Sequence, residues 1–379
     1  MRVLLLDTAF AAAPIYESLV RMGHDVWVMG NRANDVLARK AGERWINQDY
    51  SRVSEVEQHV RRLRIDYVVP GCTDVSIETS LRLGINPGLL DTPNANRILS
   101  NKDSLRGLCV DLGLPAPKVV PVDEFPMPGK FICKPVDSFS GRGIAVFDGD
   151  DQDALHAARD IARQASPSST ILIETFAAGD LYSCSAFLEN GRVVEAFYVR
   201  EGSSANPFAV DTSYVVRDLP GTCAEVVEDS LRKIYLALGL RDGLMHMQFI
   251  LDGDRPFIVE VARRCPGDLY SLLIEYSTGF PYAAKYASYF VQTSLDASRA
   301  TTRYILRHTV SSVGEEIFGG LKLTQAKNVI AFFPLQSLGQ DPIGLQKTRA
   351  GILFCEAPNR SDLLTNYECF MSRNAYDLA

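Results

Sequence analysis

The sequence has no apolar run long enough to cross a membrane. Its hydrophobic stretches fall well short of the roughly 18 residues that a membrane-spanning helix needs. The apolar run near the start, Val3–Leu6, is also shorter than the hydrophobic core of a signal peptide. We therefore expect a cytoplasmic protein that does not act on a membrane.

Cysteine pairs, histidine clusters and an excess of basic residues are missing as well. The eight cysteines and five histidines are dispersed, with no Cys-x-x-Cys motif, which argues against a disulfide framework or a zinc site. Lys and Arg total 39 against 46 Asp and Glu, a net charge of -7, so we expect no nucleic-acid partner. Hydrophobic residues make up 46% of the 379 residues, enough for a large core and more than one domain.

The beginning of the chain alternates strand and helix patterns. Apolar runs at Val3–Leu6, Asp25–Met29 and Ile65–Val69 predict buried strands, and residues 11–22 and 51–63 have helical spacing. This order predicts a Rossmann-like βαβ domain with a parallel sheet. The first strand-to-helix turn, residues 7–13, contains no glycine, so we expect no dinucleotide pyrophosphate there.

A stretch rich in Gly, Asn and Pro at residues 84–97 indicates a domain boundary. We expect the N-terminal domain at residues 1–92, a second domain at 93–295 and a C-terminal α/β extension at 296–379. Within the second domain we expect a helix around 102–112 and a helical stretch over 269–290.

The most informative segment follows a predicted strand that ends near Lys134. The loop Ser138–Gly143 comes next, with Ser140 and Gly141 inside it. A strand-end lysine offers a point charge for phosphate, and glycine lets backbone N–H groups approach phosphate oxygens. We expect the Lys134 side chain to be exposed. An ordinary hairpin turn with a surface lysine is the alternative.

Two further segments carry candidate site residues. Glu174 lies within the apolar run Thr170–Phe176, where a carboxylate is costly unless it is paired; a structural ion pair is one interpretation. Gln248 and Glu260 lie an even number of residues apart across the turn of a predicted antiparallel hairpin, so they can face one site. Their oxygens suit Mg²⁺ bridging to phosphates, whereas a half-exposed hairpin with polar outer residues is the alternative.

Together these segments resemble the ATP-grasp superfamily over essentially the whole chain. Gly243–Ile250 followed by Glu260–Arg264 is similar to the carbamoyl phosphate synthase large-subunit branch, with its Gly-Leu-Met-Asn-x-Gln-Phe and Glu-x-Asn-x-Arg patterns. The resemblance implies an α/β fold, in which the Rossmann-like domain precedes an ATP-grasp fold of two α+β lobes that grip ATP. Residues 118–180 would form the mobile lid lobe.

The resemblance also implies roles for individual residues. The first nucleotide lysine is Lys102, and the second, Lys134, contacts the phosphates during transfer. Gln248 and Glu260 would bind magnesium, and Arg264 would stabilise the reacting centre. The remaining nucleotide contacts are the flap residues Ser138, Ser140, Gly141 and Gly143, the adenine strand residues Glu174, Thr175, Phe176 and Ala177, and Ile250 under the adenine ring.

The sequence departs from the family pattern at two positions. Leu181 stands where the family places an acid for the ribose; Asp180 beside it is a possible substitute, although a regular strand would turn it to the other face. Ala262 stands where the family has a metal-binding asparagine. Fewer protein ligands, a site reshaped by Arg263, or a degenerate activity would each account for this loss.

The activity implied is that of an ATP-dependent ligase. It would activate a carboxylate as an acyl phosphate for attack by an amine, using ATP with Mg²⁺ or, as a substitute, Mn²⁺. A carboxylase that uses bicarbonate, similar to biotin carboxylase, and a non-catalytic ATP-binding protein are the alternatives. The expected partners are small-molecule substrates and a second copy in a homodimer. Weaker acceptor-side candidates are Thr73, Asp74, Arg200, Glu201 and the segments 203–212 and 264–268, in which Cys265 is not expected to act as a nucleophile.

Overall fold

The computed structural model describes residues 1–85, 88–138, 141–311, 319–325, 328–336 and 349–378. The N-terminal domain is a parallel sheet in the order β3-β2-β1-β4. Its strands are β1 (Arg2–Leu6), β2 (Asp25–Gly30), β3 (Trp45–Asn47) and β4 (Tyr67–Pro70), with helices α1 (Ala13–Arg21), α2 (Val36–Ala41), α3 (Val53–Leu63) and α4 (Asp74–Leu83). The predicted βαβ domain is therefore confirmed.

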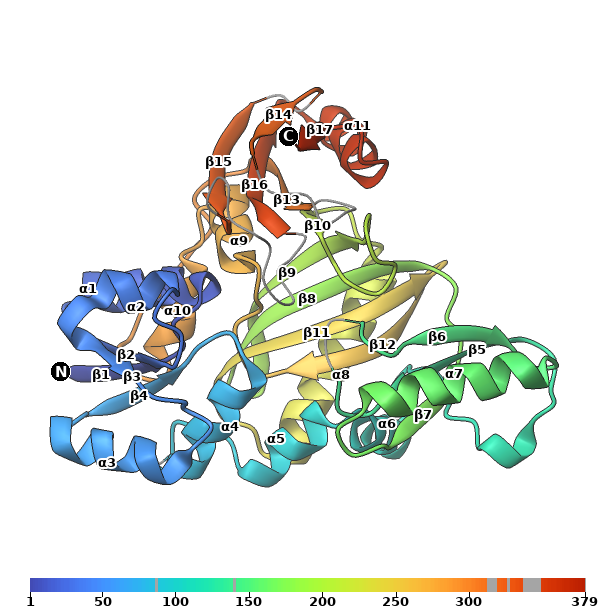
Figure 1. Cartoon of the computed structure of the whole chain (residues 1–379), viewed down its shortest axis with the longest axis horizontal. Helices are drawn as coiled ribbons and strands as arrows, with labels where there is room; N and C mark the ends of the chain where they lie inside the picture. The colour runs from blue at the N-terminus through green and yellow to red at the C-terminus, as the bar shows by residue number, and fades with distance from the viewer. Residues whose placement is uncertain (86–87, 139–140, 312–318, 326–327, 337–348, 379) are drawn as a thin grey trace.

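A small lobe projects from one side of the molecule (Figure 1). Helices α5 (Pro93–Ser100) and α6 (Lys102–Asp111) lead into it. The lobe is an antiparallel sheet in the order β6-β5-β7, covered on one face by α7 (Gln152–Ala165). Its strands are β5 (Lys130–Pro135), β6 (Ala145–Asp148) and β7 (Ile171–Thr175), and its core packs Phe131, Phe147 and Leu155 together. We call it the lid lobe.

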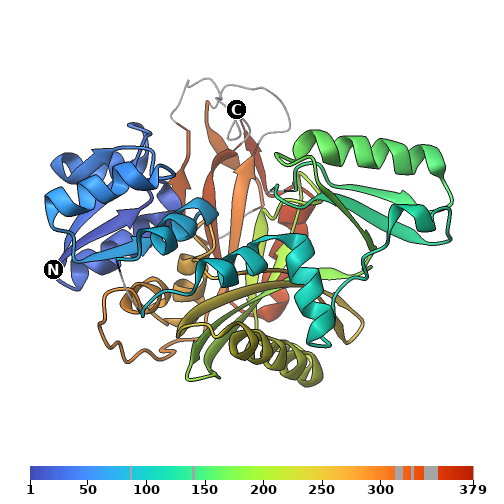
Figure 2. The same ribbon diagram turned by 90° about the horizontal axis from the view of Figure 1, so that it is seen from below.

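The centre of the molecule is an eight-stranded sheet in the order β12-β11-β8-β9-β10-β13-β16-β15. The second view shows it lying between the N-terminal domain and the lid lobe (Figure 2). Its strands are β8 (Asp180–Glu189), β9 (Arg192–Gly202), β10 (Thr212–Val216), β11 (Gly243–Asp252), β12 (Arg255–Ala262), β13 (Tyr304–Ser311), β15 (Val329–Pro334) and β16 (Arg349–Ala357). Because β13, β15 and β16 extend the same sheet, the C-terminal part of the chain completes the central layer.

The two faces of this sheet differ in character. One face packs Cys184, Met247 and Phe249 against α8 (Gly221–Leu238). The other carries serines and acids near the middle of the strands and faces α9 (Tyr270–Thr278) and α10 (Tyr282–Ser288). The N-terminal domain reaches this second face, because α1 packs against α10.

The helical stretch expected over 269–290 consists of two helices, α9 and α10. The break falls at Gly279, Phe280 and Pro281, where a left-handed glycine ends the first helix and the proline precedes the second. Beyond the sheet, α11 (Arg360–Met371) and the strand pair β14 (Leu321–Leu323) and β17 (Tyr376–Leu378) close the C-terminal end. No helix within the described ranges is long and apolar enough to cross a membrane.

Candidate active site

A buried ion-pair triad joins the lid lobe to the central sheet. Glu174 on β7 is 1% exposed, and its two carboxylate oxygens lie 2.5 Å from Lys134 Nζ on β5 and 2.5 Å from Arg106 Nε on α6. Arg106 also donates to the Val259 carbonyl on β12, at 3.1 Å. The triad therefore spans three elements and links lid to sheet.

The exposed position expected for Lys134 is wrong. The side chain is 5% exposed because it bends back onto Glu174 in place of extending into solvent. Burial lowers the pKa of Lys134 to about 8, and the nearby charges of Arg106 and Lys102 lower it further, against the opposing effect of Glu174. A lysine with this pKa still carries its charge at neutral pH, but loses it more easily than a surface lysine.

The ion-pair interpretation of Glu174 agrees with this geometry. Each of its carboxylate oxygens lies beside one of the two cations, and the expected contact to the adenine amine stays a prediction. The same holds for Thr175, Phe176 and Ala177. Thr175 and Phe176 are already tied by their N–H groups to the Lys118 and Lys130 carbonyls.

Lys102 lies at the start of α6, which Asn101 caps through its side chain. Its Nζ donates to the Ser138 carbonyl at 2.8 Å, so the first predicted nucleotide lysine touches the beginning of the flap. Ser140 lies outside the described residues. Gly141 and Gly143 both have positive φ, and a side chain at Gly141 would collide with the backbone of Phe208. Gly141 therefore lies against the loop that connects β9 and β10.

The predicted metal ligands face each other across two strands. Gln248 on β11 and Glu260 on β12 are direct cross-strand neighbours, which confirms the expected juxtaposition. Both are half-buried, and among the residues that the structure describes none forms a hydrogen bond or ion pair with Glu260. An amide oxygen and a free carboxylate form a donor set that fits Mg²⁺, which binds proteins through one or two such groups plus substrate phosphates.

Ala262, the departure from the family pattern, lies directly across from His246. The His246 ring accepts or donates at Nδ1 to the Ser185 hydroxyl, 2.7 Å away. Burial lowers the pKa of His246 to about 3, and the charge of Arg264 lowers it further. His246 is thus a neutral ring next to the position where the family asparagine is missing.

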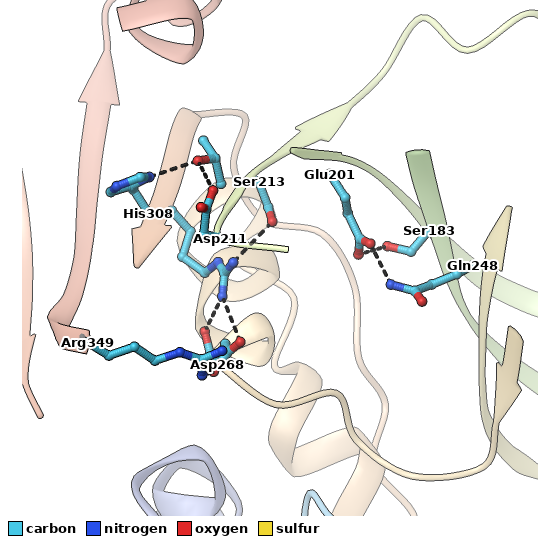
Figure 3. A network of polar contacts seen from close by, with 10 residues as sticks. Ser183, Glu201, Asp211, Ser213, Gln248, Asp268, His308 and Arg349 are labelled. Carbon is cyan, nitrogen blue, oxygen red and sulfur yellow. Dashed lines mark hydrogen bonds and ion pairs between the residues drawn. The ribbon is translucent and has the colours of Figure 1, made fainter. Parts of the chain in front are cut away.

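Glu201 is a site residue that the sequence indicated only as part of a polar stretch. It is 4% exposed on β9 and accepts hydrogen bonds from the Ser183 hydroxyl at 2.7 Å and from Gln248 Nε2 at 2.6 Å (Figure 3). Burial raises the pKa of Glu201 above its ordinary value. Only the sheet register places it beside Gln248, which is why no local pattern reveals it.

Arg264, the predicted reaction-centre arginine, forms an ion pair with Asp74 of the N-terminal domain. Its Nε and terminal nitrogen lie 2.5 and 3.2 Å from the two oxygens of Asp74, a forked pair. This ion pair raises the pKa of Arg264 despite burial. Thr73, a weaker acceptor-side candidate, caps α4 by accepting a hydrogen bond from the Ser76 N–H. The N-terminal domain therefore contributes a residue to the rim of the site.

Arg263 does not reshape the metal site. Its side chain is 8% exposed and bonds to Asp91 and to the carbonyls of Leu244 and Arg241. These partners hold the connector between domains. The expectation that Arg263 compensates for Ala262 is therefore wrong, because the side chain is committed elsewhere.

Leu181 and Ile250 are cross-strand neighbours on the face that carries Gln248, whereas Asp180 lies on the opposite face. Asp180 forms an ion pair with Arg200, which also packs over the Tyr182 ring. The ribose contact of Asp180 stays a prediction, and this placement argues against it. Ile250 is half-buried and stays the predicted floor for adenine.

A second charged group lies farther along the same face. Asp268 lies between Arg307, whose guanidinium is 3.8 Å away, and Arg349 at 3.5 Å; Figure 3 shows Asp268 and Arg349 together. Arg307 also donates to the Ser213 hydroxyl at 3.3 Å. Asp268 and the next residue both have left-handed φ values, a strained backbone of the kind that functional sites hold. Arg307 was missed because it lies outside every motif.

The loop between β9 and β10 is held by Asp211. Its carboxylate accepts from the Ser204 N–H at 2.8 Å, the Ala205 N–H at 3.0 Å and the Thr212 hydroxyl. Thr212 in turn contacts His308 Nδ1 at 2.8 Å (Figure 3). The segment 203–212, expected to be an acceptor-side candidate or a plain loop, is therefore an ordered loop that meets the flap at Phe208.

Comparison with known proteins agrees with this arrangement. Residues 127–271 match the ATP-grasp domain family. A search of curated protein sequences finds no match. Among solved structures, the chain is similar to an L-amino acid ligase from Bacillus licheniformis, with a TM-score of 0.78 and 18% identity over 100% of this chain and 98% of that one.

Two other solved structures show the same fold. Phosphoribosylglycinamide synthetase from Anaerococcus prevotii has a TM-score of 0.74 and 16% identity, covering 100% of this chain and 99% of the other. The biotin carboxylase domain of 2-oxoglutarate carboxylase from Hydrogenobacter thermophilus has a TM-score of 0.76 and 13% identity, covering 100% and 90%. Residues 127–271 of this chain thus belong to the ATP-grasp domain family, here preceded by a parallel βαβ domain.

Proposed function

We propose that the protein is an ATP-dependent ligase that joins a carboxylate to an amine, giving an amide, ADP and phosphate. The observation that carries the proposal is the chain of contacts from Lys134 through Glu174 and Arg106 to Val259, which brings the lid lysine close to the strand that carries Glu260. Glu260 and its neighbour Gln248 supply oxygen donors on the sheet. Such an arrangement suits a nucleotide triphosphate with Mg²⁺ between lid and sheet. Phosphoryl transfer asks a protein chiefly for positioning and charge neutralisation, which these residues supply.

In the proposed reaction a carboxylate oxygen of the substrate attacks the γ-phosphorus of ATP, and ADP leaves. The amine nitrogen then attacks the acyl carbon, phosphate leaves, and the nitrogen loses a proton. Lys134 and Lys102 would hold the transferring phosphates, and Gln248 and Glu260 would hold Mg²⁺, which neutralises charge on them. Arg264 would stabilise the oxyanion through its guanidinium, with Asp74 fixing its orientation.

The neighbours support this class of reaction, since an L-amino acid ligase and phosphoribosylglycinamide synthetase share the fold over the whole chain. The biotin carboxylase domain of 2-oxoglutarate carboxylase is a dimer in complex with adenosine diphosphate and magnesium. We extend the proposal to a small-molecule acid and amine as substrates, a cytoplasmic location and a homodimer.

A second candidate is a non-catalytic nucleotide-binding protein, favoured by Ala262 and by Leu181. A panel of carboxylates crossed with amines separates the two. The ligase predicts ADP and phosphate release that depends on one acid and one amine together, and a product whose mass equals their sum less one water. ATP binding without release across the whole panel would instead support the binder. Release that depends on bicarbonate would support a carboxylase.

A further inference from the structure

Glu201 is a buried carboxylate whose hydrogen-bond partners are neutral, and the charge of Arg307 acts on it only from beyond ion-pair distance. Its side chain is 4% exposed, and the two groups that donate hydrogen bonds to it, the Ser183 hydroxyl and the Gln248 amide, are both neutral. Within the described ranges no Lys, Arg or His forms an ion pair with it. Burying an anion without an ion-pair partner destabilises the folded state. A role of this charge in the site would account for its presence.

The contact to Gln248 determines which way the amide points. An ionised carboxylate can only accept hydrogen bonds. Gln248 must therefore turn its Nε2 toward Glu201, at 2.6 Å, which turns its Oε1 away. Figure 3 shows the Gln248 nitrogen facing Glu201 and the oxygen directed elsewhere. Without Glu201 the amide would be free to rotate and present either atom.

The strand order makes this orientation useful. Gln248 has Ser183 as its cross-strand neighbour on one side and Glu260 on the other. Glu201 contacts Gln248 from the Ser183 side, because Glu201 also accepts a hydrogen bond from the Ser183 hydroxyl. The Gln248 oxygen therefore points toward the side of the strand on which the Glu260 carboxylate lies.

The loss at Ala262 makes the orientation of the remaining donors matter more. With no asparagine at that position, the proposed metal ligands are the Gln248 amide oxygen and the Glu260 carboxylate. Residues that orient metal ligands typically contribute about 10- to 100-fold to metal affinity. Because Glu201 orients one of only two proposed ligands, we expect it to account for a large part of that gain in metal affinity.

We propose that Glu201 is a positioning residue of the magnesium site, which locks the Gln248 amide so that its oxygen faces the ion. The inference rests on the proposed function, because it takes Gln248 and Glu260 as metal ligands. It adds a third acid to the site, one that acts through another side chain.

The test measures metal affinity directly, with Mn²⁺ as the probe and ADP as the nucleotide. Electron paramagnetic resonance gives free Mn²⁺ during titration of the full-length protein. Glu201→Gln keeps the size of the side chain and removes its charge, so we expect Mn²⁺ to bind about 10-fold more weakly or worse. The matched control is Glu275→Gln on α9, a partly buried acid that accepts the Ala283 N–H away from the sheet; it should leave Mn²⁺ affinity unchanged.

A double-variant cycle tests whether Glu201 acts through Gln248. In the background Gln248→Ala, Glu201→Gln should change Mn²⁺ affinity by less than about twofold, because no amide remains to orient. An undiminished effect in that background would overturn the positioning role, as would an unchanged affinity in the single variant.

An exchange of the two side chains covers the case in which Glu201→Gln folds poorly. The pair Glu201→Gln with Gln248→Glu rebuilds the hydrogen bond with reversed direction and keeps an oxygen ligand at position 248. We expect Mn²⁺ affinity within a few-fold of wild type, and affinity as weak as Gln248→Ala would contradict the proposal. If wild type itself binds no Mn²⁺ with ADP, the proposed function fails; if wild type binds and Glu201→Gln matches it, only this inference fails.

Discussion

The lid side and the sheet side of the candidate site treat charge in opposite ways. On the lid side the cations are already neutralised, since Lys134 and Arg106 share the Glu174 carboxylate at 2.5 Å. On the sheet side Glu201 and Glu260 form no ion pair with any residue of the described part. This difference shows that the lid holds its cations in place through an internal acid, whereas the acids of the sheet have no ion-pair partner. In our proposal Glu260 is thereby free to bind a cation from outside the chain.

The largest expected effect on turnover comes from removing the charge of Lys134 in the lid lobe. Lys134→Met should lower ligase turnover by roughly 30- to 1,000-fold, because a lysine contact to transferring phosphates is worth about 2–4 kcal/mol. Steady-state ADP release measures it. Because Lys134 is buried, the variant should also unfold more easily in a denaturant titration, by about 1–3 kcal/mol, since Glu174 loses one of its two cations.

A second variant separates these two effects. Arg106→Met also takes one of the two cations from Glu174 but keeps Lys134, so stability should fall by a similar amount while turnover stays close to that of wild type. A loss of turnover as large as that of Lys134→Met would show that the lysine serves the fold and not the phosphates.

The matching change on the sheet side is Glu260→Gln. It keeps the shape and removes an unpaired charge, so Mn²⁺ affinity in the presence of ADP should fall by about 100-fold. The free energy of unfolding should stay within about 0.5 kcal/mol of wild type, because no described partner is lost. If Glu260→Gln instead destabilised the protein as Lys134→Met does, the contrast between the two sides would disappear.

Arg264 tests the boundary between the central sheet and the N-terminal domain. Arg264→Lys keeps the charge and loses the fork that holds Asp74, so product formation should drop by about 100-fold while nucleotide affinity stays unchanged. Calorimetry with ATP and product mass measure the two quantities. Asp74→Asn is the matched control, for which a few-fold loss is expected; an equal loss would assign the effect to the domain contact.

The pH dependence of ATP affinity and of stability tests the lid side alone. Burial holds the pKa of Lys134 near 8, below the usual lysine value, so ATP affinity should decrease as pH rises through about 8. Stability should change in the opposite direction. Between the folded pKa and the ordinary lysine value the unfolded chain binds more protons, so the lysine's contribution to stability rises with pH. Lys134→Met should flatten both profiles.

The smallest expected effect concerns the flap. Gly141→Ala places a Cβ against the Phe208 backbone at a left-handed φ, so ATP affinity should fall by a few-fold and stability by about 1 kcal/mol. Gly107→Ala in α6, where a Cβ meets open space, is the control and should stabilise the helix by roughly 0.5–1 kcal/mol. Equal effects of the two changes would remove the special role of Gly141.

The sequence allowed the local parts of the site to be predicted, and the long-range parts only in outline. Gln248 and Glu260 could be placed near each other because they lie on the two strands of one hairpin, but the register that makes them direct neighbours depends on an irregularity between Gln248 and Phe249 that the sequence does not reveal. The triad of Arg106, Lys134 and Glu174 could not, because it joins α6 to two strands of the lid lobe. The Arg264–Asp74 fork joins residues far apart in sequence, and no local pattern encodes such a pair.

Burial was the property that local patterns predicted least well. Lys134 was expected to be exposed because a strand end usually is, but a partner on the neighbouring strand buried it. Glu201 stood out in no motif, and the order of β11, β8 and β9 alone brings it to Gln248. Both errors have one cause: the side-chain environment depends on strands that are distant in sequence.

The central claim is that the substrate carboxylate is activated as an acyl phosphate, and one isotope measurement tests it directly. The acid found in the substrate screen is labelled with ¹⁸O in its carboxylate, and the phosphate released with ATP and amine is analysed by mass. The account predicts one ¹⁸O atom in each phosphate, because the oxygen that attacks the γ-phosphorus leaves with it. Phosphate without ¹⁸O, or label appearing in AMP, would contradict it.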